Sequence, residues 1–330
     1  MAADSTLPSA LPTATVLGRV ELAVAYLERS VNFWTAAIGL QVLAERPNGA
    51  DLGVDDRVLI SLVVEPGVEP APNRTGLFHV ALLLPERSDL ASWLKTALRA
   101  RVSIDGSADH FVSEAVYLTD PDGHGIEMYW DRPRSDWEGK VEEMTTDPLD
   151  VAGLIAEAPP ASAGPYLGLP AGTTIGHVHL RVAAIPAAID FYRDVIGFDL
   201  VTTLGSQAAF FAVGGYHHHI GLNTWESAGG QPPPPGTTGL YHVAILYPTR
   251  ADLADALKRL VASKVQLDGA ADHGVSEALY LHDPDMNGIE LYWDKPEAEW
   301  PRNADGSIAM TTQRLDLNDL VHTKHEKENA

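Results

Sequence analysis

Apolar residues in this chain follow two patterns in succession, a short continuous run and then a helical spacing, and the succession occurs four times. The first run covers residues 17–25 and predicts a strand, after which Val31, Trp34 and Ile38 recur on one helix face. Gly39 then ends this helix as a C-cap glycine does. Equivalent pairs of a strand and a helix are predicted at 77–84 and 88–101, at 177–182 and 186–196, and at 241–247 and 252–263.

Short β-rich segments follow every helix, so that each occurrence is a βαβββ unit. We therefore predict an α+β fold of four βαβββ units paired into two domains, each with a curved mixed sheet around a cavity. The predicted β-rich segments include 58–64, 208–213, 217–222 and 278–281. The predicted domains are a disordered N-terminal tail (1–15), an N-terminal domain (16–133), a linker rich in polar residues, proline and alanine (134–172), and a C-terminal domain with its tail (173–330).

The two halves of the chain repeat one another. Residues 76–81 (GLFHVA) recur as 239–244 (GLYHVA), and residues 117–131 recur as 280–294 with Asp-Pro and Gly-Ile-Glu at matching places. Both pairs of segments have the same separation of 163 residues. The sequence therefore predicts that the two halves fold alike and place equivalent side chains at equivalent positions.

One difference between the halves involves a residue type that binds metals. Arg19, in the sequence Gly-Arg-Val, aligns with His177, in the sequence Gly-His-Val. The second half therefore carries His177, His242 and Glu290, where the first carries arginine, histidine and glutamate. Two imidazoles and one carboxylate on one face are typical of a divalent iron or manganese site with open positions, whereas an arginine repels a cation. We predict that His177, His242 and Glu290 are metal ligands.

The composition excludes several classes of function. The 330 residues include 45 Asp and Glu against 23 Lys and Arg, a net charge of −22, which disfavours nucleic acid and anionic membranes as partners. No apolar run is long enough to cross a membrane. The chain has no cysteine, so disulfides and thiolate metal sites are excluded. This composition fits a reducing compartment, and we expect the protein in the cytoplasm.

The sequence resembles the vicinal oxygen chelate superfamily, and within it the two-domain extradiol ring-cleaving dioxygenases of the catechol 2,3-dioxygenase type. The resemblance covers about residues 16–133 and 173–320. Its most specific part is 272–280 (DHGVSEALY), followed by an Asp-Pro turn and Glu290, in the order of the ring-cleavage signature. One departure is Met286, which stands where the signature has glycine.

The resemblance implies that the C-terminal domain holds Fe(II), or Mn(II), at the residues His177, His242 and Glu290. It also implies that the N-terminal domain has lost its metal. In that domain Arg19 would pair with Glu127, because a guanidinium can replace the charge of a metal beside a carboxylate.

The same resemblance suggests roles for three further residues. Tyr280 matches the tyrosine that hydrogen-bonds a substrate oxygen, and His273 matches the histidine near the substrate hydroxyl. An acid–base histidine is expected on the strand that contains the triplet of residues 217–219. Its position favours His218, with His217 and His219 as alternatives.

The implied function is an extradiol dioxygenase that inserts O2 into a catechol-like molecule. One alternative is a glyoxalase-like metal-dependent isomerase or lyase, which usually has a second glutamate ligand. Residues 217–223 supply no such glutamate, and Glu226 comes too late along the chain. The other alternative is a non-enzymatic small-molecule-binding protein, which would leave the metal-binding residues unexplained. We expect no nucleic-acid or membrane partner and expect a homo-oligomer.

Overall fold

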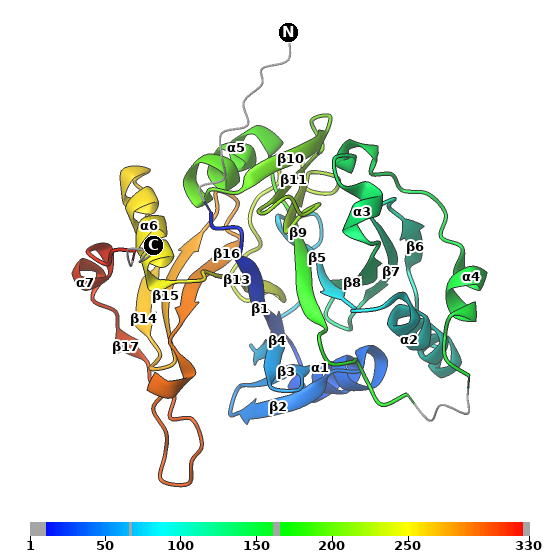
Figure 1. Cartoon of the computed structure of the whole chain (residues 1–330), viewed down its shortest axis with the longest axis horizontal. Coiled ribbons are helices and arrows are strands. Elements are labelled where there is room, and N and C mark those ends of the chain that lie inside the picture. The colour runs from blue at the N-terminus through cyan, green and yellow to red at the C-terminus, as the bar shows by residue number, and fades with distance from the viewer. Residues whose placement is uncertain (1–10, 66–67, 161–165, 326–330) are drawn as a thin grey trace.

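The chain forms two curved mixed sheets with helices on their outer sides (Figure 1), as seen in a computed structural model that describes residues 11–65, 68–160 and 166–325. The first unit contains β1 (Val16–Val24), α1 (Leu27–Phe33), η1 (Trp34–Ile38), β2 (Gln41–Arg46), β3 (Gly49–Val54) and β4 (Arg57–Val64). The second contains β5 (Gly76–Leu83), α2 (Arg87–Ala100), β6 (Gly106–Asp109), β7 (Ser113–Thr119) and β8 (Gly125–Asp131).

The second half of the chain repeats this succession. Its first unit contains β9 (Thr174–Arg181), α5 (Ile185–Ile189), η4 (Asp190–Ile196), β10 (Asp199–Leu204), β11 (Ala208–Ala212) and β12 (Ile220–Asn223). Its second contains β13 (Gly239–Leu246), α6 (Arg250–Ala262), β14 (Gly269–Asp272), β15 (Ser276–His282) and β16 (Gly288–Asp294). The predicted α+β fold of four βαβββ units is therefore confirmed.

The helices end where the sequence predicts. The first helix widens into a π-helical turn, η1, and stops at Gly39, whose φ of 100° lies in the left-handed region that favours glycine. Gly197 ends the equivalent helix in the third unit with a φ of 104°. The triplet of residues 217–219 differs from expectation, because it precedes β12 and does not form part of it.

Each sheet takes strands from both halves of the chain. The nine-stranded sheet has the order β17-β14-β15-β16-β13-β1-β4-β3-β2, and the eight-stranded sheet has the order β10-β11-β12-β9-β5-β8-β7-β6. The first unit therefore pairs with the fourth through β1 and β13, and the second pairs with the third through β5 and β9. The sheets thus cut across the expected division into 16–133 and 173–330.

Two chain crossings account for this pairing. The segments that join β4 to β5 and β12 to β13 each pass from one sheet to the other. They run beside one another, since the Thr75 amide donates to the Gln231 carbonyl and Glu69 bridges Thr237. Because the four first strands have similar sequences, the local pattern does not specify which two of them pair.

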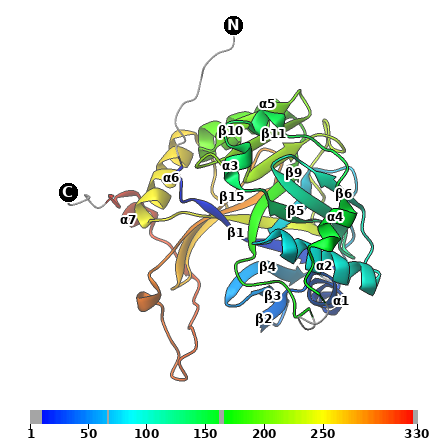
Figure 2. The same cartoon turned by 45° about the vertical axis from the view of Figure 1, so that its right-hand side comes forward.

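Short helices after each half complete the packing. Between the halves lie α3 (Arg134–Trp137), η2 (Val141–Glu143) and α4 (Val151–Ala156), and the chain continues after β16 with η5 (Glu297–Glu299), β17 (Gln313–Arg314) and α7 (Leu317–Val321). The equivalent helices α4 and α7 pack on α2 and α6 respectively. The loop before β17, drawn in orange, projects from the body in both views (Figures 1 and 2).

The expected N-terminal tail is only partly outside the described structure. Residues 1–10 lie outside the described residues, whereas Leu11 and Thr15 are buried. Ordered packing therefore begins before residue 16, because Leu11 joins the apolar core. In the described part of the chain, no helix is both long and apolar enough to cross a membrane.

Candidate metal centre

Three neighbouring strands of the eight-stranded sheet place two histidines and a glutamate on one face. In this sheet β5 lies between β9 and β8. Ala81 on β5 is paired with His177 on β9 and with Glu127 on β8, and His79 lies two residues before Ala81 on the same face. Since alanine has no side chain beyond Cβ, the three longer side chains can converge above it.

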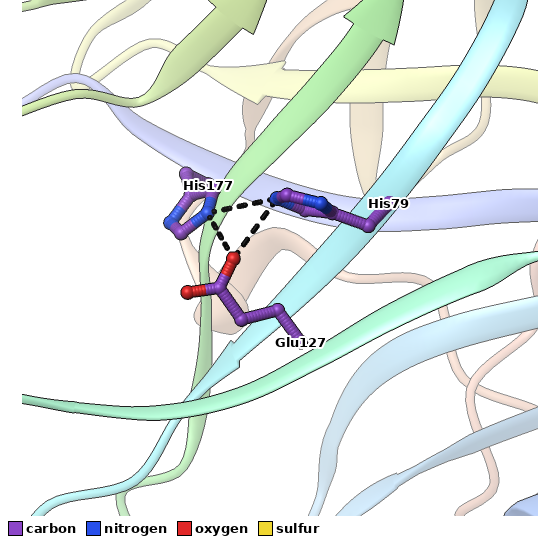
Figure 3. Close-up of side chains that lie close together, drawn as sticks. All are labelled: His79, Glu127 and His177. Carbon is purple, nitrogen blue, oxygen red and sulfur yellow. Dashed lines mark hydrogen bonds and ion pairs between the residues drawn. The ribbon is translucent and has the colours of Figure 1, made fainter. Parts of the chain in front are cut away.

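The three ligand atoms form a compact triangle (Figure 3). Glu127 Oε2 lies 2.9 Å from His79 Nε2 and 3.1 Å from His177 Nε2, and the two nitrogens are 3.2 Å apart. Three ligands on one face of an octahedron, each about 2.1 Å from a metal, would lie about 3.0 Å from one another. All three residues are buried, and in the described residues they are the one group of three with this arrangement.

The charge states of these groups suit a cation. Burial alone would raise the pKa of Glu127, but His177 and His79 outweigh it and lower the pKa well below its usual range. Burial lowers the pKa of His177 despite the opposing effect of Glu127. At neutral pH the site therefore offers an ionised carboxylate and a neutral His177 imidazole, the forms that bind metals.

Two further side chains lie beside the carboxylate. Tyr117 pairs with Glu127 across β7 and β8, and its side chain lies close to that carboxylate. His110 Nε2 lies 2.6 Å from the same hydroxyl, and His110 Nδ1 lies 2.7 Å from the Thr145 carbonyl. Burial, and then the charge of Glu127, raise the pKa of Tyr117, so that it stays a neutral hydroxyl. Such outer contacts orient metal ligands.

A cavity of about 470 Å³ opens beside the three ligands. His218 lines it, with its ring centroid 4.1 Å from that of His177. Its other walls are mostly apolar and aromatic, and none of the described residues that line it is lysine or arginine. These walls include Phe78, Val112, Met144, Leu204, Phe210 and Trp225.

The nine-stranded sheet contains a copy of this arrangement in which a guanidinium replaces one imidazole. Arg19 Nη2 lies 3.2 Å from Glu290 Oε2, and His242 Nε2 lies 3.0 Å from the same oxygen. The Tyr280 hydroxyl donates to Glu290 at 2.9 Å and lies 2.9 Å from His273 Nε2. Burial opposes ionisation of Glu290, but His242 and Arg19 outweigh it and lower its pKa to about 2.

The structure does not bring together the three ligands expected from the sequence. His242 and Glu290 are neighbours, but His177 lies in the other sheet beside His79 and Glu127. The expectation that Arg19 pairs with Glu127 is likewise wrong, since Arg19 pairs with Glu290. The physical reason is that β1 pairs with β13 and β9 pairs with β5.

The remaining predicted residues divide between the two copies. Tyr280 and His273 belong to the copy that contains Arg19, and their equivalents at the histidine and glutamate cluster are Tyr117 and His110. His218 lies in the cavity beside that cluster. His79 and Glu127 were not predicted as ligands from the sequence, although the internal repeat includes the segments that contain them.

Comparison with known proteins identifies relatives over most of the chain. The model of the "Glyoxalase/Bleomycin resistance protein/Dioxygenase superfamily" matches residues 16–128 and 174–291. A catechol-2,3-dioxygenase from Bacillus subtilis (strain 168) is 41% identical over 82% of this chain and 94% of its own length. A metapyrocatechase from Geobacillus stearothermophilus is 25% identical over 84% of this chain and 80% of its own length.

Solved structures share the fold at low sequence identity. A proposed dioxygenase from Bacillus subtilis subsp. subtilis str. 168 has a TM-score of 0.59 at 15% identity, over 85% of this chain and 86% of the other. Glyoxalase I from Zea mays has a TM-score of 0.54 at 15% identity, over 84% of this chain and 92% of the other. At this identity the two structures support the architecture alone.

Proposed function

Because the chain belongs to the glyoxalase, bleomycin resistance protein and dioxygenase superfamily, with the expected relation to catechol 2,3-dioxygenases confirmed, we propose that it is an extradiol ring-cleaving dioxygenase. The observation that carries the proposal is the buried triangle of His79, Glu127 and His177 at the wall of a cavity. These three residues, and not the trio expected from the sequence, would hold the metal. Fe(II) is the proposed ion, with Mn(II) accepted by the same donors.

The ligand set fits such an ion on both chemistry and spacing. Two imidazoles and one carboxylate, with the remaining positions open, are typical of non-haem iron oxygenases. When bound, iron would make redox chemistry between a catechol and O2 available at the cavity wall. Both oxygen atoms would enter the product as the ring opens beside its hydroxyl-bearing carbons.

The protein groups around the ligands would handle protons and orientation. His218 faces the cavity, and burial, followed by the nearby imidazoles, lowers its pKa well below the usual range. It is therefore neutral at pH 7 and able to accept a proton from a substrate hydroxyl, and to return it later. Tyr117, whose hydroxyl bonds His110, lines the cavity beside Glu127 and would place that hydroxyl against a substrate oxygen.

The cavity walls define the class of catechol. A carboxylated catechol brings an anion that requires a cationic partner, and the described lining has none. Phe78, Phe210 and Trp225 instead offer aromatic surface against a ring or an alkyl or aryl substituent. The proposed substrates are neutral catechols, unsubstituted or with apolar substituents.

The test is oxygen uptake by protein purified anaerobically with ferrous iron, with catechol, 3-methylcatechol and 2,3-dihydroxybiphenyl as substrates. We expect one O2 consumed per catechol and a yellow ring-opened product. The matched variants are His79→Ala and His242→Ala, since these residues occupy equivalent positions in the two copies. His79→Ala should lose iron and activity, whereas His242→Ala should keep both.

Two results would count against the proposal. Bound iron without oxygen uptake on any of these catechols would refute the dioxygenase and favour a glyoxalase-like isomerase or lyase. Loss of iron in His242→Ala with iron retained in His79→Ala would place the metal in the nine-stranded sheet and refute the proposed ligands His79, Glu127 and His177.

A further inference from the structure

A chain of hydrogen bonds leads from the end of strand β8 to the histidine in the cavity. Asp131 Oδ1 lies 2.8 Å from His217 Nε2, and His217 Nδ1 lies 2.8 Å from His218 Nδ1. The side chain of His217 is fully buried. His218, the last member, lines the cavity beside His177.

When both imidazoles are neutral, the donors and acceptors in this chain have one consistent assignment. A carboxylate only accepts, so His217 Nε2 must carry the proton shared with Asp131. A neutral His217 then has a lone pair at Nδ1, and the bond to His218 requires the proton on His218 Nδ1. In a neutral His218 the other nitrogen, Nε2, is therefore left as a lone pair. No group of the described chain hydrogen-bonds that atom.

We infer that Asp131 and His217 are positioning residues that hold His218 in the tautomer whose Nε2 can act as a base in the cavity. This inference rests on the proposed function for its catalytic meaning. The tautomer itself follows from the hydrogen bonds between the two neutral imidazoles and Asp131. The same logic governs a buried aspartate that orients a catalytic imidazole in serine proteases.

A pair of hydrogen-bonded tyrosine hydroxyls holds the other carboxylate oxygen of Asp131. Its Oδ2 accepts a hydrogen bond of 2.7 Å from the Tyr216 hydroxyl, which lies 2.8 Å from the Tyr129 hydroxyl. Glu127, Tyr129 and Asp131 alternate along β8 and share the face that points toward the ligands. One strand thus supplies both a proposed metal ligand and the anchor of the histidine pair.

The internal copy shows that this pair accompanies the metal-binding residues. Ile220 pairs with Val178 as Ile60 pairs with Val20, so the positions of His217 and His218 correspond to 57 and 58. These positions hold arginine and valine, although the aspartate is present in that copy as residue 294. A purely structural aspartate–histidine pair would have no reason to be confined to the copy with the intact ligand set.

The test is nitrogen-15 NMR of the full-length, metal-free protein with ring-labelled histidine, in which His217→Asn and His218→Asn assign the two rings. We expect wild-type His218 to carry its proton on Nδ1. In Asp131→Asn, the new amide oxygen should still accept from the Tyr216 hydroxyl. The amide NH2 should then face His217 and donate to its Nε2, so that His217 donates from Nδ1 to His218. His218 should then carry its proton on Nε2.

The matched control is Asp294→Asn, at the equivalent position of the other copy, which should leave the His218 tautomer unchanged. In iron-loaded protein, Asp131→Asn should lower kcat at least 100-fold with little change in KM. A wild-type His218 with its proton on Nε2, or an unchanged tautomer in Asp131→Asn, would overturn the inference. Because the NMR requires no turnover, an inactive wild type would count against the proposed function and not against the tautomer.

Discussion

Substitution of Arg19 by histidine should create a second metal site in the nine-stranded sheet. Arg19 occupies the position equivalent to His177, and its partners His242 and Glu290 already lie 3.0 Å apart. The corresponding pair in the other sheet, His79 and Glu127, lies 2.9 Å apart. Arg19→His therefore supplies the missing imidazole to a half-built ligand set.

The magnitude follows from the ion pair that is lost. At 3.2 Å, in an effective dielectric of about 20, the attraction between Arg19 and Glu290 is about 5 kcal/mol before desolvation. Because the guanidinium is one-third exposed and must be partly desolvated, its net contribution is about 1–2 kcal/mol. Metal-free Arg19→His should lose this amount of unfolding free energy. Metal at about 100 times its Kd should restore about 2.7 kcal/mol.

The assay is metal content per chain by elemental analysis, together with Tm at increasing Mn2+. Arg19→His should bind two ions where wild type binds one, and in a His79→Ala background it should bind one where His79→Ala alone binds none. The matched control is Arg19→Gln, which loses the ion pair without gaining an imidazole and should show no metal-dependent rise in Tm. A folded Arg19→His protein with wild-type metal content would refute the equivalence of the two clusters.

Three further predictions concern the strands, the buried charge and the cavity. Gly125→Ala would place a Cβ in steric conflict with the Phe78 carbonyl oxygen, forcing β5 and β8 apart. It should lower unfolding free energy by about 1–3 kcal/mol in urea and weaken metal binding at least tenfold in titration. The pKa of Glu290 is about 2 in the folded protein, below its ordinary value. The ionised carboxylate therefore stabilises the folded state fully above about pH 4.5, and this stabilisation is lost as the pH falls toward 2. Unfolding free energy should therefore drop by about 3 kcal/mol over that range in wild type, measured by urea titration, and by clearly less in Glu290→Gln. Phe210→Ala removes a ring centred 5.1 Å from the ring of His218. In oxygen-uptake assays it should raise KM for catechol about tenfold and favour bulkier aryl catechols. An unchanged substrate preference would contradict the assignment of Phe210 to the cavity wall.

Much of this protein is determined by local sequence pattern. Short apolar runs, helical spacing and C-cap glycines specified four βαβββ units, because each of these signals acts within about a dozen residues. The internal repeat likewise revealed that an arginine stands in the first half where the second half has a histidine. His218 lines the cavity, although the triplet that contains it precedes the strand on which it was expected.

The tertiary structure alone decided which units share a sheet and therefore which residues share a site. The first strands of the four units present similar edges, and nothing within any one unit distinguishes β9 as the partner of β5 from β9 as the partner of β13. The choice depends on two crossings of the chain between the sheets and on contacts about 100 residues apart in sequence, such as the one between His79 and His177. Sequence pattern thus determined the kinds of ligand, whereas the pairing of distant strand edges determined that His177 joins His79 and Glu127, because only that pairing brings their ligand atoms within reach of one ion.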